Sequence, residues 1–142
     1  DAEMVFGIKS GSDIEAGEIN VAGFKDVARQ LMESFDFELV GSHLRISHNA
    51  SENDWLVVLY DGQDFVQSTR YRIHIVDRVG GGDSFAAGLI YSLLEGKNLQ
   101  ESAEFGAAAS CLKQSIPGDF NHVSVREVEN LAAGDKSGRV KR

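Results

Sequence analysis

The 142-residue sequence has only one cysteine and one proline, and it has no long hydrophobic run. Its single thiol, Cys111, cannot form an internal disulfide, and the acidic first residues do not resemble an export signal. These absences predict a protein of the reducing cytoplasm. No apolar stretch approaches the roughly 18 residues that a membrane span needs, so no membrane association is expected.

Positive charge is also scarce. The chain has 14 lysine and arginine residues against 22 acidic residues, and its formal net charge is −8. Nucleic acids and anionic membranes attract basic surfaces, so neither is an expected partner. The content of 42% hydrophobic and 25% charged residues is typical of a globular domain with one core. Residues 135–142 are polar and basic, and we expect a flexible tail there rather than a functional arm.

Hydrophobic periodicity predicts a helix in the first third of the chain. A short helical turn at the start is interrupted by Gly11 and Gly17. From Asn20, the expected N-cap, apolar side chains recur at helical spacing and form one stripe for core packing. The stripe consists of Phe24, Val27, Ala28, Leu31, Met32 and Phe35.

Short strands are predicted in the middle of the chain. The candidates are segments 37–40, 44–47, 55–60, 65–68 and 70–76. Asp61-Gly62 lies between two of them and is a strong hairpin signal. The last segment alternates apolar and polar residues, which predicts one buried and one exposed face. His74 lies on the polar face, so we expect a surface residue there rather than a ligand.

Helices are predicted in the last third. Residues 84–94 are apolar almost all round, which indicates a buried helix ended by Gly96. Asn98 with Glu101 and Ser124 with Glu127 have the spacing of capping boxes, so two further helices are expected to begin there. Strands followed by helices indicate an α/β layer architecture.

Three consecutive glycines separate the last predicted strand from the first of these helices, in the stretch IVDRVGGGDSFAAGL. Glycine costs about 0.5–1 kcal/mol relative to alanine within regular structure, so the run suggests positive φ angles or the close approach of another group. The first N–H groups of a helix have no intrahelical partner and attract anions. Gly80, Gly81 and Gly82 therefore predict a phosphate site, although GxxxxGK[ST] and GxGxxG are both absent.

Asp83 follows the glycines directly and requires a separate explanation. An anion bound at this helix end would repel the carboxylate, unless the carboxylate takes a proton from a hydroxyl group that attacks the phosphate. From these residues alone three alternatives stay open: phosphoryl transfer, anion binding without chemistry, and a tight turn with a purely structural role.

The stretch from Asp77 to Phe85 resembles D-T-x-G-A-G-D-x-F, the C-terminal signature of the ribokinase-like (PfkB-type) carbohydrate kinases. VDRVGGGDSFAAGLIYSLLEG with AAASCLKQSIPGDFN is most similar to the family's 2-dehydro-3-deoxygluconate kinases. The resemblance implies a three-layer α/β/α (Rossmann-like) fold, of which residues 1–134 would form the C-terminal, ATP-binding half. Family members are roughly twice this length, so we expect a fragment that lacks most of the sugar site.

The resemblance also implies roles for individual residues. Asp83 would be the catalytic base, and the backbone of Gly80, Gly81 and Gly82 would form the anion hole for the γ-phosphate. Segment 113–123 resembles the loop that closes over adenine. The residues implied near the nucleotide are Ser47, Asn49, Gly118, Asp119 and Asn121.

Cations are implied as well. ATP would bring Mg²⁺, and Asp1 or Glu3 would be what remains of an acidic element that positions it. Asp77 and Val79 match positions that hold a monovalent cation, K⁺, in some members.

Arg78 and Gly81 depart from the signature, which has threonine and alanine there. Gly81 leaves the same amides available. Arg78 adds a charge that could meet a phosphate, a substrate carboxylate or a neighbouring acid such as Asp77, and the sequence does not decide among them.

The activity implied for the parent enzyme is ATP-dependent phosphorylation of a sugar hydroxyl, with 2-dehydro-3-deoxy-D-gluconate and its 6-phosphate as the first candidates. Fructose, ribose or a nucleoside are alternative acceptors. The isolated chain is expected to be inactive, or to bind nucleotide without catalysis. A homo-oligomer of the full-length enzyme is compatible with the resemblance.

Overall fold

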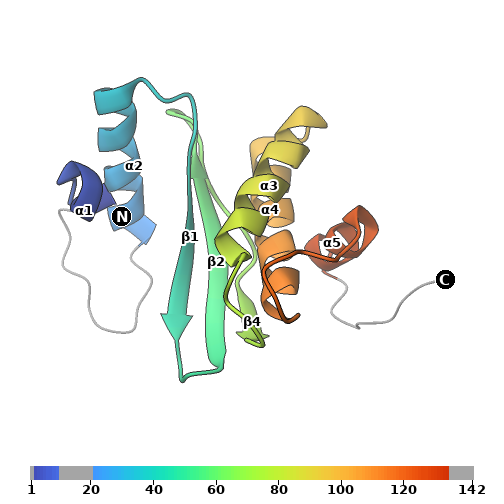
Figure 1. The fold of residues 1–142 in the computed structure, drawn as a ribbon. Coiled ribbons are helices and arrows are strands. Elements are labelled where there is room, and N and C mark those ends of the chain that lie inside the picture. Colours follow the sequence, from blue (N-terminus) through green and yellow to red (C-terminus); the bar gives the residue numbers. More distant parts are fainter. Residues whose placement is uncertain (1, 10–20, 135–142) are drawn as a thin grey trace.

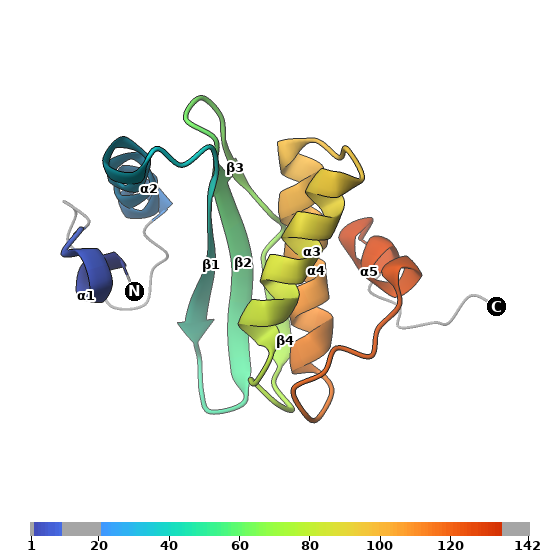
Figure 2. The same ribbon diagram turned by 45° about the horizontal axis from the view of Figure 1, so that its top comes forward.

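The computed structural model describes residues 2–9 and 21–134, which form a sheet with helices on both faces (Figures 1 and 2). Helices α1 (Ala2–Phe6) and α2 (Val21–Phe35) lie on one side of the sheet. Helices α3 (Gly81–Leu94) and α4 (Leu99–Gln114) cover the other side, and α5 (Val125–Ala132) packs against α4. The predicted three-layer α/β/α arrangement is confirmed.

Strand β2 (Glu52–Tyr60) organises the sheet, because each of the other strands pairs with it in antiparallel orientation. Strand β1 (Val40–Ser47) pairs with one edge of β2 along most of the length of β2. Strands β3 (Phe65–Gln67) and β4 (Tyr71–His74) pair with opposite ends of the other edge of β2. The hairpin predicted at Asp61-Gly62 is confirmed, and His74 is 68% exposed beside Glu52.

The prediction of separate strands at 37–40 and 44–47 is wrong, because one continuous strand begins at Val40. The chain leaves α2 through Asp36, which has a φ of 55°, and Phe37 is exposed. Gly41 interrupts the apolar pattern of this strand but continues its pairing with β2, opposite Leu59. Backbone pairing, which the side-chain pattern does not display, therefore sets the length of β1.

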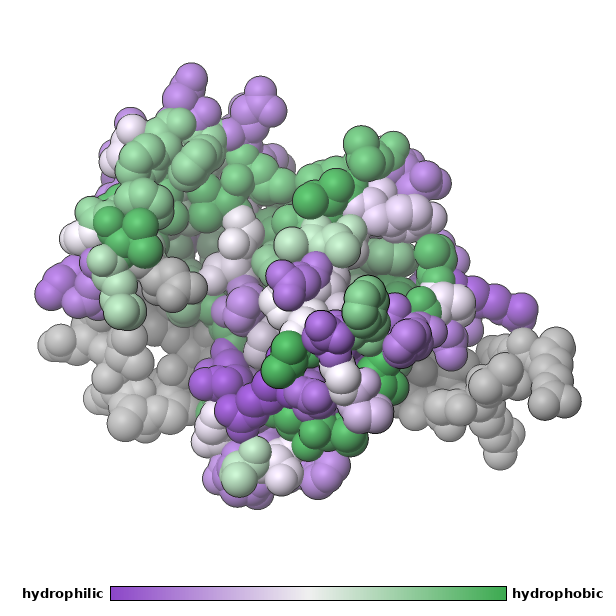
Figure 3. Space-filling model, viewed as in Figure 1, coloured by the Kyte–Doolittle hydropathy of each residue, from purple (hydrophilic) through white to green (hydrophobic). Residues whose placement is uncertain are grey.

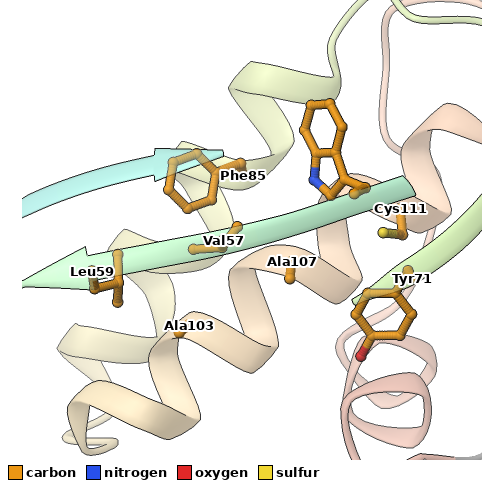
Figure 4. Close-up of a cluster of buried hydrophobic side chains, with 8 residues drawn as sticks. Val57, Leu59, Tyr71, Phe85, Ala103, Ala107 and Cys111 are labelled. Carbon is orange, nitrogen blue, oxygen red and sulfur yellow. The ribbon is translucent and has the colours of Figure 1, made fainter. Parts of the chain in front are cut away.

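Alternate residues of β2 enter two separate cores. Val57 and Leu59 face α3 and α4, where they pack with Phe85, Ala107 and other buried side chains (Figure 4). Leu56 packs with other residues towards α2. The sheet is therefore apolar on both faces, which explains why the predicted strand 55–60 reads as a continuous hydrophobic run.

Helices α3 and α4 approach closely through small residues. A methyl group built on Gly88 would lie 3.0 Å from Cβ of Ala109 and 3.3 Å from Cα of Gly106. The prediction of a buried helix at 84–94 is wrong for part of its surface, because Ile90 is 58% and Leu94 is 82% exposed. Figure 3 shows apolar surface near the C-terminal end of α3 and over α1 and α2.

The two predicted capping boxes and the glycine predicted to end α3 are confirmed. Asn98 with Glu101 and Ser124 with Glu127 form complete capping boxes, and Gly96 has a φ of +72° after α3. Asp1, Gly11, Gly17, Asn20 and the tail 135–142 lie outside the described residues. Within the described ranges, none of the helices is both long and apolar enough to cross a membrane.

Candidate active site at the glycine turn

The turn between β4 and α3 is held against the end of α4. The backbone N–H groups of Val76 and Asp77 both donate to the carbonyl oxygen of Gln114, at 2.9 and 3.2 Å. Gly80 is the N-cap residue of α3, with a φ of 79°, and no side chain caps the helix. The helix begins at Gly81, three residues before the predicted start, so the glycines and Asp83 form its first turn.

Two backbone donors in this first turn are free. The N–H of Gly81 donates to Arg78 and that of Ser84 to Gly80, but within the described part of the chain no hydrogen bond engages the N–H groups of Gly82 and Asp83. Donors at the positive end of a helix dipole attract an anion. The turn therefore offers two adjacent donors to a negatively charged ligand.

The three glycines have different physical requirements. A side chain on Gly80 would overlap the carbonyl oxygen of Asp119, and its positive φ also favours glycine. Gly81 is buried against Gln114, and its carbonyl accepts a hydrogen bond of 2.8 Å from Ser110 Oγ. Within the described ranges, a methyl group built on Gly82 would have one neighbour within 4 Å, Cε1 of His43 at 3.9 Å. Gly82 is thus the glycine that leaves room for a ligand.

Asp77 ties the turn to the loop after α4. Its Oδ1 accepts from the N–H of Val79 and its Oδ2 from the N–H of Gly118, both at 3.0 Å. These two hydrogen bonds, in that order of importance, hold the pKa of the Asp77 carboxyl below its ordinary value, and the charge of Lys113 lowers it further. The carboxylate form therefore stabilises this arrangement.

Because the folded-state pKa of Asp77 is depressed, its contribution to stability is present above the unfolded-state value of about 3.9 and is lost as the pH falls through the folded value. We expect Asp77→Asn to lower the melting temperature at pH 7, and the difference from wild type to shrink below pH 4. Calorimetric melting from pH 7 to pH 3 measures this, with Asp64→Asn on the β2–β3 turn as the control. A difference independent of pH would contradict the assignment.

A pocket of about 420 Å³ lies between the sheet and the glycine turn. Its walls carry two guanidinium groups, from Arg45 on β1 and Arg78 in the turn, and Gly82 borders it. Arg78 also donates to the carbonyl oxygen of Ala50 at 2.9 Å, which links the β1–β2 hairpin to the turn. Among the described residues Arg78 forms no ion pair, so the alternative of a pair with Asp77 is not observed.

His43 forms part of the same wall and was not predicted from the sequence. Its ring stacks on Trp55 with centroids 4.6 Å apart and meets the edge of Phe85 at 5.9 Å. Burial first, and then the charge of Arg45, lowers its pKa, so the ring is neutral at pH 7. His43 and Arg45 point to the same face of the sheet because they are two positions apart along one strand. Correct bounds for β1 would have identified both.

A second, mainly apolar hollow of about 660 Å³ lies between β1 and the helices α1 and α2. Gly82 and His43 border both hollows, so the free N–H groups lie near their junction. Glu3 also borders the larger one and pairs with Lys9 at 3.0 Å. Asp83 is exposed, and no hydrogen bond or ion pair engages its carboxylate within the described ranges. It is therefore available to a ligand.

The structure places the other predicted nucleotide-binding residues at varying distances from the turn. Gly118 and Asp119 adjoin it through Asp77 and Gly80. Ser47 ends β1, and the Asn49 side chain accepts from the N–H groups of Ser51 and Glu52, which shapes the hairpin.

The predicted loop 113–123 begins later than expected, because α4 continues to Gln114. Within that loop, Asn121 donates to the carbonyl oxygen of Ala109 and accepts from the N–H of Val123. Its amide nitrogen therefore holds the loop on α4, and its amide oxygen stabilises the backbone of the loop itself.

Comparison with known proteins gives a consistent result. The sequence model of the pfkB family of carbohydrate kinases matches residues 27–121. The crystal structure of 2-dehydro-3-deoxygluconokinase from Thermotoga maritima superimposes with a TM-score of 0.85 and 44% identity, over 94% of this chain and 39% of that one.

Two curated relatives are similar in sequence. The 2-dehydro-3-deoxygalactonokinase of Haloferax volcanii is 28% identical over 79% of this chain and 33% of its own length. The 5-dehydro-2-deoxygluconokinase of Photobacterium profundum is 30% identical over 81% of this chain and 36% of its own. The chain thus spans about a third of the length of these relatives.

Proposed function

The chain belongs to the pfkB family of carbohydrate kinases, and we propose that it is the ATP-binding part of an enzyme that phosphorylates a hydroxyl group of a sugar acid. The observation that carries this proposal is the first turn of α3. Among the residues that the structure describes, the backbone N–H groups of Gly82 and Asp83 have no partner, and they adjoin a carboxylate that has none either. Phosphoryl transfer to a hydroxyl group needs a site that binds the transferred phosphate and a group that takes the proton of the hydroxyl. The first turn of α3 offers both.

The chemistry follows from these groups. Asp83 takes the proton from the sugar hydroxyl, whose oxygen forms a bond to the γ-phosphorus of ATP as the bond from that phosphorus to the bridging oxygen of ADP breaks. The N–H groups of Gly82 and Asp83 stabilise the charge on the phosphoryl oxygens. The products are ADP and a sugar phosphate, with the proton on Asp83 released to water.

Magnesium fits this site as an ion that arrives with the nucleotide. Within the described ranges no group of three or more histidine, cysteine or acidic side chains could hold a metal by itself. Mg²⁺ in kinases is bound by phosphates, water and one or two carboxylates, and Glu3 is a carboxylate on the wall beside Gly82. Bound there, it would neutralise phosphate charge.

The proposed acceptor is 2-dehydro-3-deoxy-D-gluconate, phosphorylated at its 6-hydroxyl. The support is the 44% identity to a kinase named for this substrate, together with relatives named for similar dehydro-deoxy sugar acids. Phosphorylation assays of the full-length protein on these acids, fructose, ribose and a nucleoside test it. Preference for a neutral sugar or a nucleoside would refute the substrate, and no transfer to any acceptor would refute the activity.

Arg45 is proposed to bind the phosphates of the nucleotide that are not transferred, because it borders the pocket beside Gly82. Hydrogen bonds to charged groups are worth about 1.5–3 kcal/mol, so Arg45→Met should raise the KM for ATP by roughly tenfold or more. We expect a smaller change in the KM for the sugar acid. Steady-state kinetics measure both, with Arg126→Met on the exposed face of α5 as the control. An unchanged KM for ATP would contradict this role.

The second candidate is that the isolated chain binds nucleotide without catalysis. It is favoured by the fraction of its relatives that the chain spans, about a third. Calorimetric titration of the 142-residue chain with Mg-ATP, followed by a transfer assay, distinguishes the candidates. Binding without transfer is expected, whereas transfer by the isolated chain would refute this candidate.

A further inference from the structure

Lys113 is a charged residue in the interior of the protein. It lies near the end of α4 and is 0% exposed, which makes it the largest of the fully buried side chains. Its Nζ donates one long hydrogen bond, 3.4 Å, to the carbonyl oxygen of Ile116, and it forms no ion pair within the described ranges. An ammonium group has three N–H donors, and a buried charge is costly without compensation. A lysine at this position therefore requires an explanation.

The side chain extends beneath the glycine turn. Its Cε would lie 3.2 Å from a methyl group built on Gly80, the residue that also adjoins the carbonyl oxygen of Asp119. The ammonium charge is close enough to Asp77 to lower the pKa of that carboxyl, after the hydrogen bonds from Val79 and Gly118. Lys113 is thus enclosed by the two segments that Asp77 joins, the turn at 77–80 and the loop at 116–119.

The residues present do not fit the monovalent cation that the family resemblance implies at Asp77 and Val79. Each carboxylate oxygen of Asp77 already accepts a backbone N–H, and the N–H of Val79 is one of those donors. A buried positive charge is also present beneath the turn. A second cation here would be repelled by the ammonium group.

We propose that Lys113 is a built-in cation, whose ammonium group positions the glycine turn and supplies positive charge beneath the phosphate site, so that phosphoryl transfer needs no K⁺. The proposal rests on the proposed function, since it concerns the same turn. An ammonium group and K⁺ have the same charge, and carbonyl oxygens bind both. Because Lys113 is fully buried it cannot touch the phosphate, so it is a positioning residue that acts through the backbone of Gly80 to Asp83.

The test is the dependence of the transfer rate on the monovalent cation. The full-length enzyme is assayed at constant ionic strength in potassium chloride and in tetramethylammonium chloride, a cation too large for a buried site. We expect wild-type rates within about twofold of each other in the two salts. A rise of tenfold or more in potassium chloride would overturn the proposal, whereas absence of transfer in both salts would overturn the proposed function and this inference with it.

The variant Lys113→Met distinguishes a role of the charge from a role in packing. We expect its rate in tetramethylammonium to fall about 100-fold and to recover at least tenfold in potassium or ammonium chloride, with kcat affected more than the KM for the sugar. Lys25→Met, at an exposed position of α2, is the control. Equal loss in every salt would indicate packing alone and would overturn the proposal. If Lys113→Met does not fold, the wild-type comparison still decides.

Discussion

Replacement of Asp83 by asparagine in the full-length protein should remove nearly all turnover, a decrease of about 10²–10⁴-fold, and leave ATP binding unchanged. Asparagine has almost the same shape as aspartate, so the first turn of α3 and its free N–H groups should persist. The amide cannot take a proton from the sugar hydroxyl. Since Asp83 is exposed and has no partner in the described structure, the variant should fold normally.

Steady-state kinetics and calorimetric titration with Mg-ATP measure the two effects of Asp83→Asn separately. Glu95→Gln is a suitable control, because it removes an exposed carboxylate at the other end of the same helix. A near-normal kcat would refute the assignment of Asp83 as the base. Loss of ATP binding together with turnover would instead indicate that the variant changes the turn itself.

Replacement of Gly82 by valine is expected to have the second large effect, at least a tenfold loss of ATP affinity with a lower rate. The side chain would extend into the space from which a phosphate reaches the N–H groups of Gly82 and Asp83. Among the described residues, a β-carbon on Gly82 would come within 4 Å of His43 alone, so the protein itself should accommodate valine. The melting temperature should therefore change little while ATP binding fails.

Variants of the neighbouring glycines provide the comparison. Gly82→Ala should reduce ATP affinity less than valine does, because a methyl group extends less far into the space for the phosphate. The fold should tolerate it, since the methyl group would be 3.9 Å from its nearest neighbour in the described structure. Gly80→Ala should instead destabilise the fold, because the positive φ costs about 1–2 kcal/mol and the methyl group overlaps Asp119. Unchanged ATP affinity and rate in Gly82→Val would count against the anion site.

Features that depend on local sequence were predicted correctly. The apolar stripe of α2, the capping boxes at Asn98 and Ser124 and the turn at Asp61 each need only residues a few positions apart. The glycine turn with Asp83 could be identified for the same reason, since strand end, glycines and helix start are contiguous. The family resemblance rests on this stretch, and the match to the pfkB family confirms it.

Features that depend on distant partners could not be predicted. The bounds of β1 are determined by pairing with β2, so His43 and Arg45 were not expected beside Gly82. An all-apolar helix can be buried on every side, but α3 is exposed at Ile90 because α4 covers only one side of it. The burial of Lys113 was not predicted either, because it depends on contacts of its side chain with the glycine turn and with the loop after α4.

The central claim is that the N–H groups at the start of α3 bind the terminal phosphate of ATP while Asp83 faces the acceptor hydroxyl. A crystal structure of the full-length protein with a non-hydrolysable ATP analogue and 2-dehydro-3-deoxy-D-gluconate tests it most directly. The account predicts γ-phosphate oxygens within about 2.7–3.2 Å of the backbone nitrogens of Gly82 and Asp83, and the 6-hydroxyl within hydrogen-bonding distance of the Asp83 carboxylate. A terminal phosphate bound elsewhere, with these nitrogens unoccupied, would contradict it.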